Sequence, residues 1–346
     1  MKRIIFVFIG ILAAVSGFSQ ANLQPAATVN LIRTEQITVG QLRTEVTRLE
    51  QASGQTLPQA ERLEVLDVMI NERLALQAAE RDRVTVTDNE VNMQIQQLRN
   101  AMAQQVGRQP TDAEFAQAIR AESGLDMVTF REQLRRQLIV QKYLMEKKGH
   151  VISAVRQPTD EEIRAEYVLL RSTLVRPETI RVTMIQVPYG PDAASRARAR
   201  TLADSLVREI GNDPSKFDEV AARSVAPNSG FQAGDAGYLP RTQEARQLMG
   251  QQFMDIAFAL RQGQVSRLIE GTQAFHIVKV TENYAEKNLE LTDIVQLGTR
   301  ITVRDLIGQG MLNQRQQAVL GQASQELIDE LRTGRTFQIF ADNIRW

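Results

Sequence analysis

Few residues of this chain could carry out covalent or metal chemistry. Its 346 residues include two histidines, His150 and His276, and no cysteine. A zinc site of ordinary ligand spacing cannot be assembled from these. A Ser-His-Asp triad would have to recruit one of the two histidines, and neither has the glycine pattern of a nucleophile elbow nearby. The phosphate-binding patterns GxGxxG and GxxxxGK followed by Ser or Thr do not occur. We therefore predict no metal, no cofactor and no use of nucleotides.

The two histidines differ in their surroundings. His150 follows Lys147, Lys148 and Gly149, which is typical of the end of a helix, where the helix dipole favours positive charge. His276 lies on an otherwise apolar predicted strand. By itself, this position fits either a catalytic group or a core imidazole whose hydrogen bonds are satisfied within the fold.

The region around His276 contains a strand, two helices, a glycine turn and a closing strand. In chain order, these predicted features lie at residues 180–187, at Phe217 and Ala221, at residues 234–237 (Gly-Asp-Ala-Gly), at residues 253–260 and at His276. With this order and spacing, residues 178–282 resemble the parvulin family of peptidyl-prolyl cis/trans isomerases. The resemblance implies a four-stranded antiparallel sheet with helices.

The resemblance also assigns site residues, position by position. Two apolar pocket positions of the family fall on Met249 and Phe253, and one family histidine falls on His276. The other polar positions are replaced: the first family histidine by Met184, the cysteine or aspartate by Ala226, and a hydroxyl residue by Gly271. The resemblance therefore implies that His276 is the remaining catalytic residue and that Met249 and Phe253 bind substrate.

Prolyl isomerisation requires no nucleophile, because the enzyme has only to favour the twisted amide over the planar one. The uncatalysed rotation barrier is about 18–20 kcal/mol. Met249 and Phe253 could hold a proline, but the polar network that would favour the twisted amide lacks two members, at Met184 and Ala226. Two alternatives stay open: His276 is catalytic or a core imidazole, and the two apolar residues line a pocket or pack a helix.

The N-terminus has the features of a secretory signal peptide. Lys2 and Arg3 precede an apolar run over residues 4–15, which is too short for a comfortable membrane span. Ser19 and Ala21 suit a signal peptidase, so residues 1–21 are predicted to be removed, with an uncleaved anchor as the alternative. The lack of cysteine excludes disulfides and a lipid-modified N-terminal cysteine. We expect a periplasmic protein without stable membrane insertion.

The composition indicates packed domains and no affinity for nucleic acid. Lys and Arg together number 41, as do Asp and Glu, so the net charge is zero and nothing favours an anionic partner. Hydrophobic residues make up 43% of the chain, which is enough for packed cores. The length fits two or three domains. A cluster of Arg196, Arg198 and Arg200 is expected on a solvated helix face.

The N-terminal half is predicted to be helical. Apolar residues recur with helical period in four stretches, at residues 42–49, 63–74, 91–102 and 130–145. Four threonines stand three residues before a Gln or Glu, the spacing of a capping box that starts a helix. These pairs are Thr38 with Gln41, Thr87 with Glu90, Thr111 with Glu114, and Thr159 with Glu162. Residues 66–98 in particular resemble the N-terminal chaperone domain of SurA, PrsA and PpiD proteins.

Both ends of the chain carry short strand patterns. Near the N-terminus, residues 29–32 and 36–39 predict a hairpin. Near the C-terminus, the sequence predicts a strand-like pair at 302–303 and a helix over 306–331 that is interrupted by Gly308 and Gly310. Residues 337–340 then predict a final strand. Neither the hairpin nor the strand 337–340 is long enough to stand alone. Pairing the two would close the helical domain with both chain ends, as SurA-like chaperones are built.

This organisation predicts an α+β protein with an inserted domain. A SurA-like helical domain would cover residues 22–177 and be completed by residues 283–346. The parvulin-like domain, residues 178–282, would be inserted between hinges at Pro177 and Asn283.

The resemblances imply an ATP-independent chaperone that reversibly buries apolar side chains of unfolded outer-membrane or secreted polypeptides. Its parvulin-like domain would have weak or no activity. The alternative is an active peptidyl-prolyl isomerase that assists the folding of exported proteins. A third possibility is a periplasmic or surface-exposed binding protein that kept the scaffold.

Overall fold

A computed structural model describes residues 20–211 and 213–346. This part of the chain has an α+β fold, as predicted, and divides into two compact units. The first unit joins residues up to 156 with residues 314–346, and the second is residues 157–313. The predicted signal peptide, residues 1–21, lies outside the described residues apart from its last two. These two begin the short helix α1 (Gln20–Leu23).

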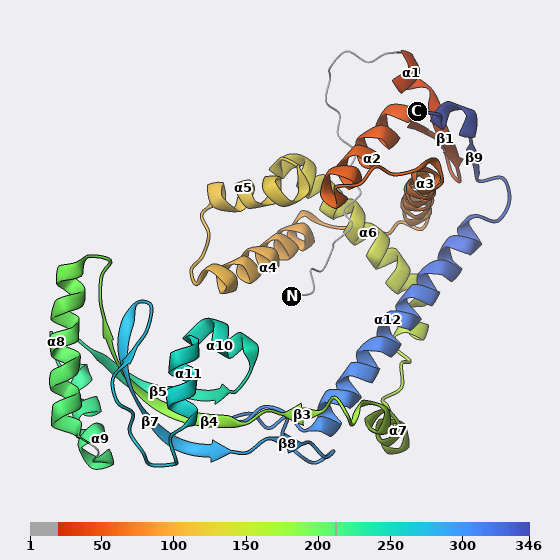
Figure 1. The fold of residues 1–346 in the computed structure, drawn as a ribbon. Helices are drawn as coiled ribbons and strands as arrows, with labels where there is room; N and C mark the ends of the chain where they lie inside the picture. Colours follow the sequence, from red (N-terminus) through yellow and green to blue (C-terminus); the bar gives the residue numbers. More distant parts are fainter. Residues whose placement is uncertain (1–19, 212) are drawn as a thin grey trace. The chain divides into compact units, whose positions relative to one another are not determined.

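The first unit is mainly helical (Figure 1). After α1 comes a hairpin of β1 (Pro25–Asn30) and β2 (Thr34–Thr38). The helices that follow are α2 (Val39–Ser53), α3 (Gln59–Arg81), α4 (Asp88–Val106), α5 (Asp112–Ser123) and α6 (Met127–Ile152). The unit is completed by the second half of α12 (Val303–Leu331), by β9 (Phe337–Ile339) and by the 3-10 turn η2 (Ala341–Ile344).

Local capping residues start several of these helices. All four predicted capping boxes are present, at α2, α4, α5 and α7 (Asp160–Leu170). At α2, the Gln41 N–H donates to Thr38 Oγ1 at 3.2 Å, and the Thr38 N–H donates to Gln41 Oε1 at 3.0 Å. Each box satisfies backbone donors that the first helical turn leaves unpaired. His150 lies in the last turn of α6, also as predicted.

The two ends of the chain meet in one small sheet. Its strand order is β2-β1-β9, with β1 in the centre and antiparallel to both neighbours. In the pairing with β9, Ala27 lies opposite Ile339 and Val29 lies opposite Phe337. The predicted closure of the helical unit by both chain ends is therefore confirmed. A hairpin alone is only marginally stable, so the third strand and the packed helices stabilise this one.

The main core of the first unit combines N-terminal and C-terminal side chains. Buried residues from the hairpin, α2 and α3 pack with Leu327 and Leu331 of α12 and with Ile344 of η2. Polar contacts hold the same elements: Arg332 pairs with Asp67 of α3 at 2.9 Å. The guanidinium groups of Arg43 and Arg62 lie 4.7 and 5.6 Å from the ring centroid of Trp346.

A second, smaller core lies among α4, α5 and α6. Its buried members are Val91, Ile95, Phe115, Ile119, Leu125, Phe130 and Leu134, with Met102 and Met127 partly buried beside them. The members on α4 and α6 belong to helical faces that the sequence periodicity predicted, whereas Phe115 and Ile119 lie on α5, of which only the capping box was predicted. The three helices thus form a separately packed arm of the first unit, which we call the α4–α6 arm.

The second unit contains an antiparallel sheet with helices on both faces. The strands of this unit are β3 (Val175–Arg176), β4 (Thr179–Pro188), β5 (Gln232–Pro240), β6 (Ile269–Glu270), β7 (Ala274–Tyr284) and β8 (Lys287–Asn288). Its other elements are α7, α8 (Ala193–Ile210), α9 (Pro214–Ala222), η1 (Arg223–Val225), α10 (Gln243–Met249), α11 (Gln251–Phe258) and the start of α12.

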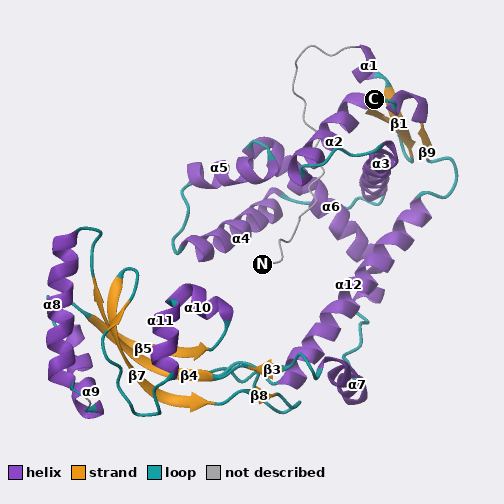
Figure 2. Cartoon of the chain, viewed as in Figure 1, coloured by secondary structure: helices purple, strands orange, loops and turns teal. Residues whose placement is uncertain are grey.

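The four-stranded sheet has the order β5-β4-β7-β6 (Figure 2). Side chains alternate between its two faces. Ile185, Val187 and Phe275 pack on α8 and α9, whereas Ile180, Val182 and Val278 pack on α11. Along β4, and along β7 as far as Val280, the residues that point to the α11 face therefore have even numbers. This alternation decides which side chains can reach His276.

The segments that lead into and out of this sheet are themselves paired. Beyond the sheet, β3 pairs with β8, and the Tyr167 hydroxyl of α7 donates to the Leu289 carbonyl at 3.1 Å. Ile163 of α7 and Val303 of α12 are buried together with Leu289. Asn283, one of the two predicted hinges, lies inside β7, opposite Ile180.

Three local predictions need correction. The Gly-Asp-Ala-Gly segment 234–237 is not a turn between strands: it lies inside β5 at a register shift, where Thr183 pairs with Asp235 and Val182 pairs with Gly237. Thr302 forms a single bridge to Ile294, but Val303 already begins α12. α12 continues through Gly308 and Gly310 without interruption.

The shared core predicts unequal effects of two leucines on α12. Leu327 is 4% exposed and Leu320 is 44% exposed. We expect Leu327→Ala to lower the free energy of unfolding of the first unit by about 2–5 kcal/mol. Leu320→Ala should change it by less than about 0.5 kcal/mol. Urea titration followed by the fluorescence of Trp346, the single tryptophan, measures both. Equal effects would contradict a core completed by the C-terminal helix.

Candidate functional site

His276 lies on β7 with one face of its ring against α11. It is directly opposite Gln186 on β4 and Ile269 on β6. The ring of Phe253 meets the imidazole edge-on, with centroids 5.6 Å apart and planes at 89°. The strand pairing and the α11 packing therefore bring together two of the residues that the sequence selected, His276 and Phe253.

Gly271 closes the other side of the imidazole. A Cβ atom at this position would lie 2.6 Å from Nε2 of His276 and 2.9 Å from the carbonyl oxygen of Ala274. The Gly271 backbone is held on both sides: its N–H donates to Ala274 at 2.9 Å, and its carbonyl accepts from the Tyr189 hydroxyl at 2.5 Å. A hydroxyl side chain here would have to displace the imidazole. The residue type at 271 and the position of His276 are thus coupled.

The surroundings of the His276 imidazole do not favour its use as an acid or a base. Burial lowers the pKa of His276 below its ordinary value of 6.5, so the ring is neutral at pH 7. Among the described residues, its buried Nδ1 has no hydrogen-bond partner. A catalytic imidazole is normally oriented by a partner at its second nitrogen. This histidine is instead positioned by the packing of Phe253 and Gly271.

The other replaced positions contribute no polar group. Met184, on β4, is half-buried and packs with Met249 against the α11 core. Ala226 is exposed in the loop between η1 and β5, where its N–H donates to the Arg223 carbonyl at 3.1 Å. The environment of His276 is therefore apolar on the Met184 side, and a methyl group stands at position 226.

Met249 and Phe253 differ in how much they expose. Phe253 is 2% exposed and belongs to the same buried cluster as Met254 and Ala257. Met249, at the end of α10, is only partly buried. In this structure a ligand could contact Met249 directly, but it would reach little of the Phe253 ring. The assignment of both residues to substrate binding remains a prediction.

The structure adds two residues that sequence reasoning missed, Gln186 and Gln232. Gln186 is opposite His276, and Gln232 of β5 is opposite Gln186. A signal for Gln186 existed, because it stands two residues after Met184 and must share its face of the strand. Gln232 could not be found in that way, because its neighbours depend on how β5 pairs with β4.

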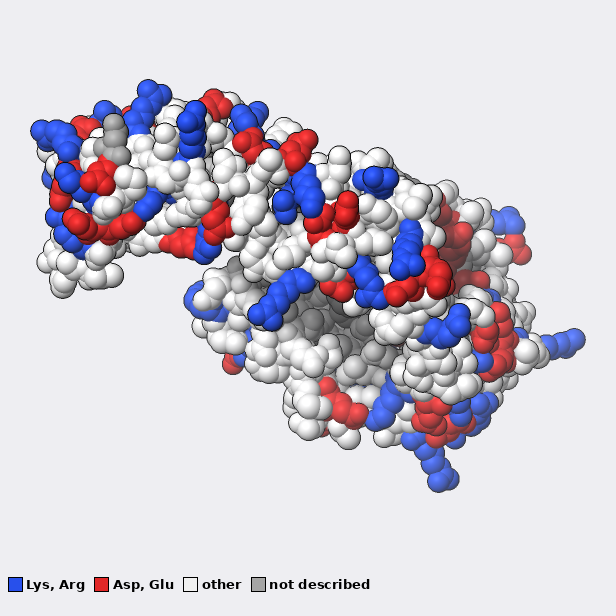
Figure 3. Space-filling view, turned by 90° about the horizontal axis from the view of Figure 1, so that it is seen from below, with Lys and Arg blue, Asp and Glu red and all other residues white. Residues whose placement is uncertain are grey.

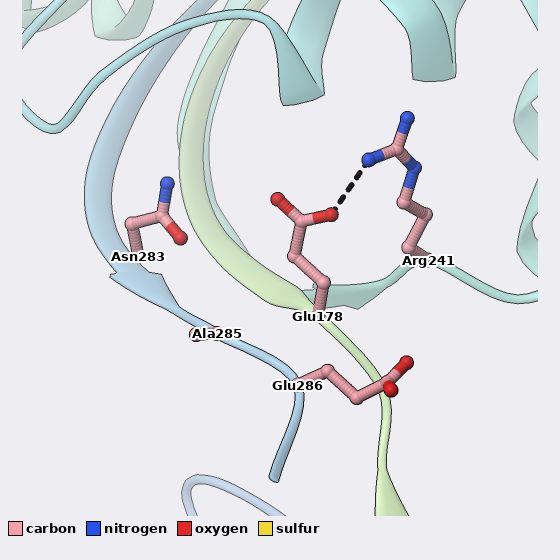
Figure 4. Close-up of a pocket in the computed structure, with 5 residues that line it drawn as sticks. All are labelled: Glu178, Arg241, Asn283, Ala285 and Glu286. Carbon is pink, nitrogen blue, oxygen red and sulfur yellow. Dashed lines mark hydrogen bonds and ion pairs between the residues drawn. The ribbon is translucent and has the colours of Figure 1, made fainter.

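A separate pocket lies near the start of β4 and the end of β7 (Figure 4). It has a volume of about 460 Å³ and is lined by Glu178, Arg241, Asn283, Ala285 and Glu286. Arg241 is already paired with Glu178 at 2.6 Å, and its guanidinium lies 5.3 Å from the Phe258 ring centroid. The pocket lining contains none of the residues around His276.

Charged side chains of both signs lie on the surface. On the face shown in Figure 3, acidic and basic side chains are interspersed. Arg196 and Arg200 are exposed as predicted, and both pair with Glu270. Among the described residues, no group of three or more His, Asp or Glu side chains could hold a metal ion. Within residues 20–211 and 213–346, no helix has the length and apolar character needed to span a membrane.

Two family models match the chain. The SurA-like N-terminal domain matches residues 2–144, and the PPIC-type PPIASE domain matches residues 183–282. The first match covers the hairpin and most of the N-terminal helices. The second covers β4 to β7 and includes His276, Met249 and Phe253. PPIC-type domains are the parvulin-type domains that the sequence resembled.

Curated relatives agree with these matches. The chain is 25% identical over 293 residues to a protein named Chaperone SurA from Chromohalobacter salexigens, covering 82% of this chain and 63% of the relative. It is 26% identical over 276 residues to Chaperone SurA from Saccharophagus degradans, covering 78% of this chain and 60% of the relative. The chain thus spans less than two thirds of the length of these relatives.

Solved structures of similar proteins were also found. A SurA-like chaperone of Campylobacter jejuni is 14% identical, covers 89% of this chain and 99% of its own, and has a TM-score of 0.32. PrsA from Bacillus subtilis is 19% identical, with coverages of 85% and 89% and a TM-score of 0.27. TM-scores this low do not by themselves establish a shared arrangement of the whole chain.

The burial of Phe253 predicts an effect on stability. Phe253→Ala removes a ring that is 2% exposed, and we expect it to destabilise the second unit by about 3–5 kcal/mol. Leu248→Ala is the control, because Leu248 lies nearby on α10 and is 83% exposed. Differential scanning calorimetry measures both. If Phe253→Ala leaves the melting of this unit unchanged and weakens only peptide binding, the ring is a ligand anchor.

The lowered pKa of His276 predicts a pH-dependent stability. Because the folded-state pKa lies below the unfolded value of about 6.5, the unfolded chain binds more protons between these two values. The contribution of neutral His276 is therefore complete at pH 7.5 and is lost as the pH falls from 6.5 through the folded-state pKa. Urea unfolding of the wild type and of His276→Gln at pH 7.5 and 5.5 tests this. An identical loss of stability in both proteins would contradict it.

Proposed function

We propose that this SurA-like chain, which carries a PPIC-type domain, is an ATP-independent chaperone for unfolded exported polypeptides. The proposal is supported by the N-terminal family match over residues 2–144 and by the relatives named Chaperone SurA. Because the chain covers only part of those relatives, their activity is carried over as a hypothesis. Client binding would lower the concentration of free, aggregation-prone chain by mass action.

The observation that carries the proposal is the state of the PPIC-type site. Its single imidazole is neutral, lacks a partner at Nδ1, and has Met184 and Gly271 at the positions of family polar residues. An isomerase must bind the twisted amide more tightly than the planar one. Apolar contacts that are equally strong with the planar and the twisted amide cannot favour the twisted one. This geometry favours binding without efficient catalysis.

The α4–α6 arm offers several exposed apolar side chains for clients. Val128 is 74% exposed, Val106 is 53% exposed and Met93 is 52% exposed. Met102 and Met127 are partly buried against the core of the same arm. Methionine is flexible and polarisable, so it can adapt to clients of different sequence. We assign this arm to initial client contact.

Location and clients follow from the same hypothesis. The basic and apolar N-terminus, residues 1–21, supports export to the periplasm with removal of the signal peptide. The clients would then be outer-membrane or secreted polypeptides in transit. The organisation that fits this role is a helical chaperone domain, residues 22–177 and 283–346, with residues 178–282 as the inserted PPIC-type domain.

An active isomerase is the second candidate. The match to the PPIC-type PPIASE domain favours it, together with the retained contact between His276 and Phe253. The two functions differ in one measurable property, which is acceleration of a refolding reaction limited by proline isomerisation. We expect mature protein to accelerate it little or not at all. Strong acceleration that disappears in His276→Ala would support the enzyme.

The chaperone function predicts suppression of aggregation without nucleotide. An unfolded β-barrel outer-membrane protein is diluted from urea into an equimolar amount of mature protein, and light scattering is recorded. We expect the scattering to fall several-fold. Met93→Glu combined with Val128→Glu should weaken this effect, because a charge opposes burial of apolar client side chains.

Val168→Glu is the matched control, since Val168 is 71% exposed but lies on α7 of the second unit. It should suppress aggregation as the wild type does. If mature wild-type protein leaves the scattering curve unchanged, the chaperone proposal is wrong. If both variants lose activity equally, the assignment to the α4–α6 arm is wrong.

A further inference from the structure

Three polar side chains form a row across the four-stranded sheet. Gln232 of β5 pairs with Gln186 of β4, and Gln186 pairs with His276 of β7. Residues directly opposite each other in antiparallel strands share a face, with Cβ atoms about 4.5–5.5 Å apart. Because His276 contacts Phe253 of α11, all three side chains point to the α11 face.

The row becomes more exposed toward the edge of the sheet. His276 and Gln186 are half-buried, and Gln232 is exposed on β5, which is the edge strand. Among the described residues, neither glutamine side chain has a hydrogen-bond partner, although many other glutamines on this chain have one, such as Gln77 and Gln264. Two neighbouring carboxamides are therefore available to a ligand.

The adjacent row is apolar and is open at its β5 end. It consists of Gly234 on β5, Met184 on β4 and Val278 on β7, which is buried. Gly234 is exposed, and a Cβ atom built there would meet no heavy atom within 4 Å. Met184 and Met249 are both partly buried against the α11 cluster. A chain lying over β5 and β4 would thus meet no side chain at 234 and the flexible thioether of Met184 next to it.

We propose that Gln186 and Gln232 bind the main-chain amide groups of an extended polypeptide segment, with Met184 and Met249 contacting its side chains. Each carboxamide offers one acceptor oxygen and two N–H donors, which complement the C=O and N–H of a peptide group. The inference rests on the proposed chaperone function and identifies a second contact for the client. It differs from a proline site, because the recognised groups belong to the backbone.

The chemistry of the row argues against a charged ligand or a proline-specific one. Two charged residues of the sheet are already engaged: Lys279 pairs with Asp218 at 2.6 Å, and Arg181 pairs with Glu282 at 2.8 Å. Proline has no backbone N–H that could donate a hydrogen bond to a carboxamide oxygen. Binding should therefore depend little on salt or on proline.

Fluorescence anisotropy of the full mature chain tests the site. The probe is a labelled nine-residue peptide of Ala, Leu, Ser and Tyr, and a second probe has Pro at its central position. The test variant is Gln186→Met combined with Gln232→Met, which keeps side-chain length but removes every donor and acceptor. Each lost neutral hydrogen bond weakens binding about two- to tenfold. We expect Kd for the proline-free probe to rise about tenfold.

The control is Gln243→Met, because Gln243 is exposed at the first position of α10 and lies outside the row. It should bind as the wild type does, and thermal melting should show that both variants are folded. Purely apolar binding predicts that the double variant binds equally well or more tightly, which would overturn the proposal. A preference of tenfold or more for the proline probe would also overturn it.

The test separates this inference from the chaperone function. Suppression of aggregation by the double variant is measured in parallel by light scattering. If peptide affinity is unchanged in the double variant while aggregation is still suppressed, the glutamine site is wrong and the chaperone function stands. If the wild type neither binds the probe nor suppresses aggregation, both are wrong.

Discussion

The structure depends on the antiparallel pairing of β1 with β9, because this pairing holds both ends of the chain in one sheet. β1 lies between its hairpin partner β2 and the C-terminal strand β9, so a two-stranded hairpin of marginal stability becomes a three-stranded sheet. The same ends contribute Leu327, Leu331 and Ile344 to the core of the first unit. With β1 and β9 joined there, the chain can carry a second compact unit, residues 157–313, between α6 and the second half of α12. A unit inserted in this way can change its site without weakening the core of the first unit.

The site of the second unit shows such a change. Strand pairing and α11 still place an imidazole beside an aromatic ring, at 5.6 Å between centroids. The family's other polar positions, which would support catalysis by the imidazole, are Met184, Ala226 and Gly271 in this chain. Gly271 is in close contact with the imidazole. Two glutamines instead stand in line with His276. In the function proposed here, the fold keeps a surface that holds a polypeptide, whereas the means of favouring a twisted amide is reduced. Binding and catalysis can separate on one scaffold because they require different side chains.

The sequence predicted features that depend on neighbouring residues and missed those that depend on strand register. All four capping boxes were found from Thr and Gln or Glu three positions apart, because both partners lie in one helical turn. The strand predicted at 302–303 failed because Thr302 caps α12: its hydroxyl accepts from the Asp305 N–H at 3.1 Å. Gly308 was expected to interrupt that helix, but it allows α7 to approach, since a Cβ there would lie 3.3 Å from Ile163. The bulge in β5 and the row formed by Gln232 follow from pairing between distant strands, and the burial of Phe253 follows from the packing of α11 on those strands. No local pattern in the sequence encodes that pairing.

The central claim is that this chain binds unfolded polypeptide without efficiently rotating prolyl bonds. Two-dimensional NMR exchange spectroscopy of a labelled proline peptide, recorded with and without the mature protein, tests both parts in one sample. The account predicts that peptide resonances broaden on binding while exchange between the cis and trans signals stays too slow to give cross-peaks. Strong exchange cross-peaks at substoichiometric protein, lost in His276→Ala, would contradict the account and identify the protein as an isomerase.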